Sequence, residues 1–170
     1  MTDNEKMVLR GYAAVFNVPT ALWVDPDGNA IYELISPRAF EGCDMSNVHL
    51  LYNHSSEVFS VAGTSNGSLT VTPDQYGLKI RAELVNTTAG RDLFHMVQTG
   101  LLSKMSFAFT VASERYDKAT RTRVIERFSR LYDVSAVTHP AYKQTSIYAE
   151  GSSSEEVELL RQKIKMKAMR

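Results

Sequence analysis

Ser106 stands in a strand-like segment where a serine could act as a nucleophile. Side chains alternate across a strand, so Met105 and Phe107 share one bulky face, while Ser106 lies on the other face with the small Ala108. A substrate could approach that less bulky face. A serine hydroxyl is a poor nucleophile unless a base removes its proton, so Ser106 would need a histidine within hydrogen-bond reach. The alternative is an outward-facing serine with no chemical role.

His54 is the candidate for that base. It directly follows the apolar run Val48–Tyr52, which is typical of a short buried strand, and it precedes small polar residues. The end of a strand holds a general base rigidly while leaving one side of the imidazole open. The competing interpretation is a histidine that closes a strand without taking part in any reaction.

Two residues compete to orient the imidazole of His54. On the segment Leu131–Tyr142, alternation places Asp133, Ser135 and His139 on one face of a strand. Asp133 and His139 are six residues and therefore about 20 Å apart, so both cannot contact one imidazole. An aspartate within a strand needs a partner if it is buried, and a carboxylate offsets the charge of an imidazolium. We therefore favour Asp133 as the residue that orients His54, with His139 as the alternative. If Asp133 has no such role, it is an exposed residue that pairs with an arginine.

The segments that must position these residues are mainly strands. Alternation of apolar and polar residues is clearest in Gly77–Leu84 and indicates a half-buried strand. The other segments expected to form strands are Val8–Phe16, Ala30–Ile35, Val48–Tyr52, Gly63–Thr72, Lys104–Ser113 and Arg123–Val137.

Helices are expected to be few and short. Leu93, Met96 and Val97 fall at helical spacing and predict a helix over Thr88–Gly100. A proline within Ser36–Phe40 predicts the first turn of another helix there. The sequence therefore predicts a mainly β domain with short helices, of the α+β class, with an antiparallel, barrel-like sheet.

The last twenty residues differ in composition from the rest. Gly151–Ser154 is typical of a linker, and Glu155 and Glu156 then open a segment that ends in basic residues. Acidic residues at the start and basic residues at the end favour a helix. We therefore expect one domain over residues 1–150, the part that would carry the serine chemistry, and a linker with a separate helical tail over residues 151–170.

Composition narrows the classes of partner. The formal net charge is +0, whereas a protein that grips nucleic acid usually carries a basic excess. A single cysteine, Cys43, allows neither an internal disulfide nor a cysteine-rich metal cluster. The first residues lack the apolar core of a signal peptide, and no apolar run reaches the length of a membrane span. We expect a soluble protein of a reducing cytoplasm, with neither nucleic acid nor membrane as a partner.

Five segments in order resemble the prohead protease family of tailed bacteriophages, over roughly residues 8–149. The family opens with a Gly-Tyr-Ala strand, carries a histidine after an apolar strand, and places its serine in a Met-Ser-Phe strand. The matching segments are Gly11-Tyr12-Ala13, Leu50 to His54, Asp74 to Leu78, Met105 to Phe109 and Asp133 to Tyr142. Their common order makes the match more specific than any one of them.

The resemblance implies a serine endopeptidase with a fold related to the herpesvirus capsid protease, assemblin. By position, His54 matches the family's base, Ser106 its nucleophile and Asp133 its acidic third member. No metal or organic cofactor is implied. Such enzymes act inside the immature capsid, in the host cytoplasm, on scaffold or on the scaffolding segment of the major capsid protein, and often on themselves. The portal is a further candidate partner, and self-association is expected.

Two other classes of function remain open. The same domain could serve as a non-enzymatic capsid assembly factor, although the presence of both Ser106 and His54 argues against a decayed protease. An esterase of another fold would carry a Gly-x-Ser-x-Gly turn, and none surrounds Ser106.

Overall fold

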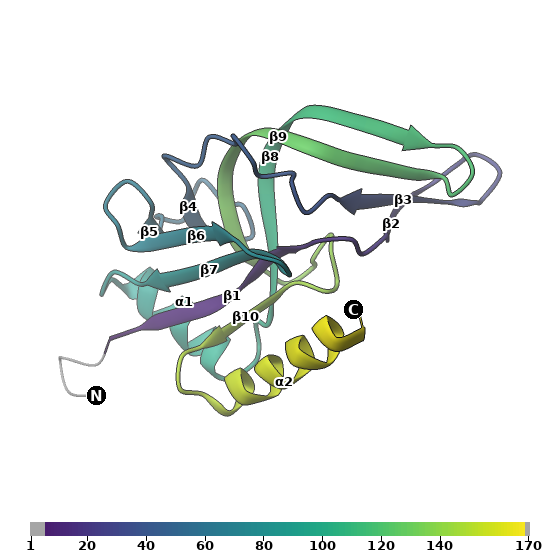
Figure 1. Cartoon of the computed structure of the whole chain (residues 1–170). Helices are drawn as coiled ribbons and strands as arrows, with labels where there is room; N and C mark the ends of the chain where they lie inside the picture. The colour runs from purple at the N-terminus through teal and green to yellow at the C-terminus, as the bar shows by residue number, and fades with distance from the viewer. Residues whose placement is uncertain (1–5, 169–170) are drawn as a thin grey trace.

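The computed structural model describes residues 6–168, apart from the side chains at 164, 165, 167 and 168. Within these residues two sheets and two helices form the molecule (Figure 1). The strands are β1 (Val8–Val15), β2 (Thr20–Val24), β3 (Ala30–Ile35), β4 (His49–Tyr52), β5 (Ala62–Gly63), β6 (Leu69–Pro73), β7 (Gly77–Glu83), β8 (Lys104–Asp117), β9 (Thr122–Val137) and β10 (Ser146–Ala149). The helices are α1 (Thr88–Gln98) and α2 (Ser153–Ala168).

The first sheet is antiparallel and has the strand order β10-β1-β7-β6. Gly11 of β1 is required where β1 meets β10, because a Cβ atom there would lie 2.0 Å from the carbonyl oxygen of Ser146. The alternation seen in the sequence fits this sheet, since Leu78, Ile80 and Ala82 of β7 are fully buried.

The second sheet is mixed, with the order β2-β3-β9-β4-β5 and with β8 paired to β9. The long strand β9 runs antiparallel to β8, but it pairs in parallel with β3 along its first part and with β4 along its last part. The prediction of a mainly β domain with short helices and a C-terminal helix is confirmed. The sheets do not close into a barrel, and the two parallel pairs depart from the antiparallel arrangement that we expected.

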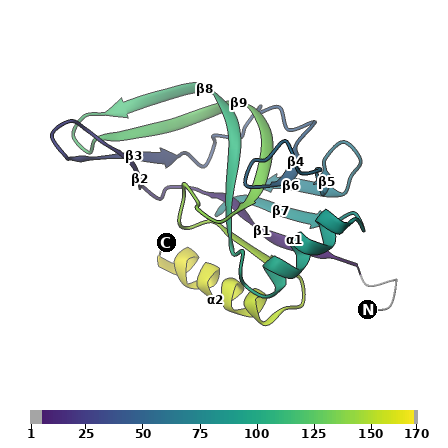
Figure 2. The same cartoon turned by 180° about the vertical axis from the view of Figure 1, so that it is seen from behind.

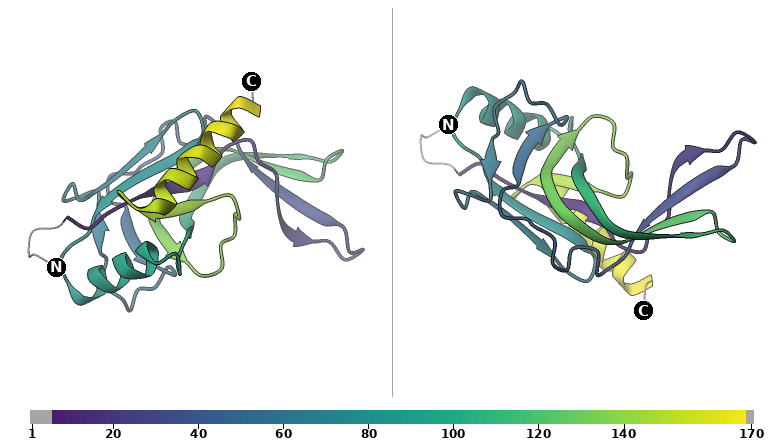
Figure 3. Two further views of the ribbon diagram at one scale, coloured as in Figure 1. Left: turned by 90° about the horizontal axis from the view of Figure 1, so that it is seen from below. Right: turned by 90° about the horizontal axis from the view of Figure 1, so that it is seen from above.

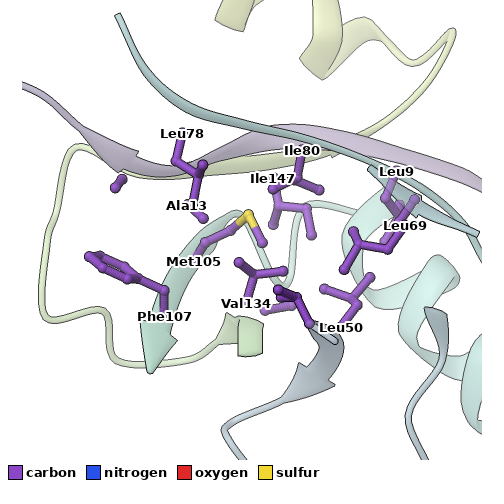
Figure 4. Packing of buried hydrophobic residues seen from close by; sticks show 14 of the residues in the cluster. Leu9, Ala13, Leu50, Leu69, Leu78, Ile80, Met105, Phe107, Val134 and Ile147 are labelled. Carbon is purple, nitrogen blue, oxygen red and sulfur yellow. The ribbon is translucent and has the colours of Figure 1, made fainter. Parts of the chain in front are cut away.

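The main core lies between the two sheets (Figure 4). Met105 and Val134 point from the second sheet toward Ala13, Leu78 and other apolar residues of the first. These side chains are buried to 5% exposure or less. Burial of this apolar surface is the main force that holds β8 and β9 in place.

Helix α1 begins where the sequence predicted. Thr87 caps its first turn by accepting a hydrogen bond from the backbone N–H of Gly90, at 3.1 Å. Leu93 and Val97 are the apolar residues at helical spacing, and both are buried in the core. The helix thus closes one end of the space between the sheets (Figure 2).

The prediction of a helix that starts at Ser36–Phe40 is wrong, because residues 37–42 form consecutive turns. The backbone N–H of Phe128 in β9 donates to the carbonyl of Ala39 at 2.7 Å, and that carbonyl would otherwise continue a helix toward Cys43. Cys43 instead bonds back to the carbonyl of Phe40, at 3.1 Å. Ala39 and Phe40 are buried, so packing against β9 overrides the local signal.

The last part of β8 and the first part of β9 form a hairpin, which projects with β2 and β3 away from the rest of the molecule (Figures 1 and 3). We call these four segments the arm. Within the arm, the buried carboxylate of Glu33 in β3 accepts hydrogen bonds from Arg123 of β9, at 2.7 Å, and from the hydroxyl of Tyr142. This network ties the arm to the segment that follows β9.

Helix α2 lies beside β10, on the side of the first sheet that faces away from β8 and β9 (Figures 2 and 3). Its Gln162 is buried, and Met166 packs on a small cluster formed by Tyr12, Val15 and Tyr76. The tail is therefore a helix, as expected, and it rests on the domain. Neither α1 nor α2, within the part of the chain described, is long and apolar enough to cross a membrane.

Candidate active site

The predicted site residues Ser106 and Asp133 lie on one face of the second sheet, where β9 lies between β4 and β8. Ser106 of β8 is directly opposite Ser135 of β9, and Ala108 is opposite Asp133. Paired residues of an antiparallel ladder project from the same face, with Cβ atoms about 5 Å apart. Ser106, Asp133 and Ser135 therefore share the face opposite to the core.

His54 reaches this face because the chain turns sharply after β4. Asn53 and His54 both have left-handed backbone conformations, with φ of 49° and 55°. Asparagine and histidine adopt this conformation more often than most residues, but it is uncommon outside glycine and must be stabilised by its surroundings. The backbone N–H of Asn53 donates to the carbonyl of Ala136 at 2.9 Å, and its side-chain oxygen accepts from the N–H of Thr138 at 3.0 Å. The turn is thus fastened to the last part of β9.

The imidazole of His54 is hydrogen-bonded to the carboxylate of Asp133. His54 Nδ1 lies 2.7 Å from Asp133 Oδ1. The side chain of His54 is 36% exposed and that of Asp133 only 11%. A carboxylate can only accept, so Nδ1 carries the proton and Nε2 of the neutral ring is left as the acceptor. This is the tautomer that a general base needs.

The structure brings Asp133 to His54 and leaves His139 apart from it. His139 is exposed, and its Nδ1 lies 3.1 Å from the hydroxyl of the adjacent Thr138. Ser106 is half-buried on the strand next to Asp133 and Ser135. Among the described residues, its hydroxyl makes no hydrogen bond to His54. Such contacts are often long in a free enzyme and shorten when substrate binds.

Ser135 was placed on this face by sequence reasoning but was given no role there. Its side chain is fully buried, and its hydroxyl lies 2.7 Å from Asp133 Oδ1. The same oxygen is 3.2 Å from the backbone nitrogen of His54. The signal that could have found it is its position two residues after Asp133, on the same face of one strand.

The described residues hold no group of three or more His, Cys, Asp or Glu side chains arranged for a metal ion. The chemistry that this arrangement can perform is proton transfer between a serine hydroxyl and an oriented imidazole, as in acyl transfer. Ser106 would attack, His54 would take and return the proton, and Asp133 would orient the ring.

A solved structure shares the fold. The KSHV protease, crystallised with a hexapeptide phosphonate inhibitor, superposes with a TM-score of 0.52 over 95% of this chain and 77% of that chain. The two sequences are 11% identical, so the likeness concerns the fold. The expected relation to a herpesvirus protease fold is confirmed.

Sequence comparison gives the family. The prohead protease of Enterobacteria phage HK97 is 28% identical over 151 residues, which cover 86% of this chain and 61% of that relative's length. The family model described as caudovirus prohead serine protease matches residues 1–160. That match spans nearly the whole chain and includes the segments that carry His54, Ser106 and Asp133. This chain therefore belongs to the caudovirus prohead serine protease family.

Proposed function

We propose that this chain is a serine endopeptidase of prohead maturation, with Ser106 as nucleophile, His54 as base and Asp133 as the acid that orients the base. The observation that carries the proposal is the 2.7 Å hydrogen bond between His54 Nδ1 and Asp133 Oδ1, on the sheet face that also presents Ser106. Family membership supports the same reaction class.

The proposed reaction is acyl transfer. His54 Nε2 takes the proton of Ser106 as Ser106 Oγ attacks the scissile carbonyl, and a tetrahedral intermediate forms. His54 then gives the proton to the leaving amine, and the acyl-enzyme remains. Water activated by His54 hydrolyses the acyl-enzyme, which releases the carboxylic acid product and restores Ser106. Asp133 keeps Nδ1 protonated and stabilises the imidazolium that forms during each step.

The proposed substrates are scaffold or the scaffolding segment of the major capsid protein, together with the protease itself. The proposed place of action is the assembling prohead in the host cytoplasm, with self-association and portal contact as further proposals. A relative that is itself named a prohead protease supports this setting. The chain spans about three fifths of that relative's length.

The test is co-expression with the major capsid protein that the same phage encodes, followed by mass measurement of both chains. Wild-type protein should shorten the capsid protein at one site, and Ser106→Ala should abolish this while remaining folded. Loss of a triad member costs on the order of 10⁴- to 10⁶-fold in rate. Ser103→Ala is the matched control, because Ser103 is exposed and lies just before β8.

Two outcomes would contradict the proposal. Normal processing by a folded Ser106→Ala variant would eliminate the serine mechanism. Absence of cleavage by wild-type protein that nevertheless promotes assembly would favour the non-enzymatic assembly factor.

A further inference from the structure

The hydroxyl of Ser135 touches both the base and the acid of the proposed triad. Ser135 is fully buried, and its Oγ lies 2.7 Å from Asp133 Oδ1, 3.2 Å from the backbone nitrogen of His54 and 3.3 Å from His54 Nδ1. We infer that Ser135 is a positioning residue, which acts on the proposed reaction by holding Asp133 and His54 in register. The inference rests on the proposed function and adds a fourth side chain to it.

Donors and acceptors can be assigned from the chemistry of the groups. The Asp133 carboxylate only accepts, so the single proton of the Ser135 hydroxyl points to Oδ1. The lone pairs of Ser135 Oγ then accept the backbone N–H of His54. His54 Nδ1–H donates to Asp133 Oδ1, which is the nearer acceptor, at 2.7 Å, and is charged. Ser135 Oγ, at 3.3 Å from Nδ1, is at most a weak second acceptor.

Asp133 Oδ1 therefore receives two hydrogen bonds, one from the imidazole and one from Ser135. Two donors on one oxygen prevent the carboxylate from rotating about its Cβ–Cγ bond. The orientation of the imidazole follows, because its Nδ1–H must point at a fixed acceptor. A single donor would hold the carboxylate less firmly against partial rotation about this bond, which would move the acceptor out of line with Nδ1–H.

The second contact acts on the backbone that carries the base. His54 has a φ of 55°, an uncommon conformation outside glycine, and its N–H is satisfied by Ser135. The side chain of Ser135, on the neighbouring strand β9, thus fixes the position of the His54 backbone as well as the orientation of its imidazole. Removal of the hydroxyl would release both ends of the His54–Asp133 hydrogen bond.

Burial by itself does not explain these contacts. Ser146 of β10 is also buried, at 4% exposure, and its hydroxyl has no hydrogen-bond partner among the described residues. A buried serine in this protein can therefore go without the contacts that Ser135 makes. Ser146→Ala is for the same reason a well-matched control for Ser135→Ala.

The test measures kcat and KM separately on a peptide that spans the capsid protein's cleavage site. Ser135→Ala should lower kcat by about 10- to 100-fold, the range for loss of a hydrogen bond to a charged group, with KM within about twofold. Ser146→Ala should keep the wild-type kcat. A loss that came only from a weakened fold would instead reduce the active fraction, which titration with a phosphonate active-site label would count.

A measurement on the wild-type chain keeps the inference testable if Ser135→Ala does not fold. In the wild-type chain, the backbone N–H of His54 should exchange slowly with solvent, and the Nδ1–H proton should give a low-field resonance. A folded Ser135→Ala variant with wild-type kcat, or a His54 amide that exchanges as fast as an open loop, overturns the inference and leaves the proposed triad intact. Peptide left uncut by the wild-type chain would overturn the proposed function, and the positioning role with it.

Discussion

His54 and Asp133 are 79 residues apart in the chain, yet their side chains meet at 2.7 Å. The contact determines which nitrogen of the imidazole carries the proton, and therefore whether Nε2 is free to act as a base. In Asp133→Asn the side-chain amide can donate to Nδ1, so the ring keeps its proton on Nε2, where the serine proton must go.

Asp133→Asn is accordingly expected to lower kcat/KM for peptide cleavage by several orders of magnitude. His139→Gln should leave it within several-fold, because His139 is exposed and bonds to its own neighbour Thr138. Both values are to be measured on variants whose circular dichroism matches the wild type. The reverse pattern would move the third role to His139.

At the scale of single residues, the alternation of side chains along a strand predicts much of the site. It places Ser106 away from the bulky face of its strand, and it places Asp133 and Ser135 together. It does not show that Ser135 bonds to His54, because that contact depends on two left-handed residues after β4 and on the register of β4 with β9. Neither leaves a local signal in the sequence.

Among the elements, α2 has the clearest separable role. It covers Tyr12 and Tyr76 through Met166, and burial raises the pKa of Tyr76 to about 12. The active-site face of β9 belongs to the other sheet. The helix therefore supports the first sheet without forming part of the proposed triad.

A chain that ends at Glu150 is expected to cleave peptide at close to the full-length rate, with a lower Tm because the Tyr12 and Tyr76 cluster loses its cover. Thermal unfolding and peptide assays on both lengths check this. The pKa of Tyr76 should fall toward its ordinary value in the shortened chain. A folded but inactive short chain would place the tail inside the catalytic domain.

Among the strands and helices, local sequence patterns predict position along the chain but not the pairing of distant strands. The expected strands and the helix α1 follow from periodicity, which acts over a few residues, whereas β2 and β10 lie outside the segments expected to form strands. Parallel pairing of β9 with β3 and β4 depends on how distant segments fill the core, and a strand has the same alternation in either direction. The turns at residues 37–42 likewise depend on a bond from Phe128.

Across the whole molecule, several tyrosines are buried in the neutral form. Burial is the main cause that raises the pKa of Tyr12, Tyr76, Tyr142 and Tyr148. The neighbouring carboxylate of Glu33 raises the pKa of Tyr142 further. A raised pKa of an acid means that the folded state prefers the proton more than the unfolded state does.

The stability that these tyrosines contribute is complete below the ordinary tyrosine pKa near 10 and is lost as pH rises through the folded values, about 12 for Tyr76. The fold should therefore weaken in strongly alkaline solution. Tyrosinate absorbance should show these four residues titrating late, together with the loss of circular dichroism. One titration step near the ordinary value, with the fold intact, would contradict this burial.

The place of β9 between β4 and β8 also sets when the proposed triad can form. His54 is made first, Ser106 comes next, and Asp133 is made 79 residues after His54. At about 5 to 20 residues per second, a ribosome needs roughly 4 to 16 s to travel that distance. During this time the growing chain holds His54 with no partner for its imidazole, and β4 has no β9 to pair with. A nascent chain therefore cannot complete the proposed triad until Asp133 has been made.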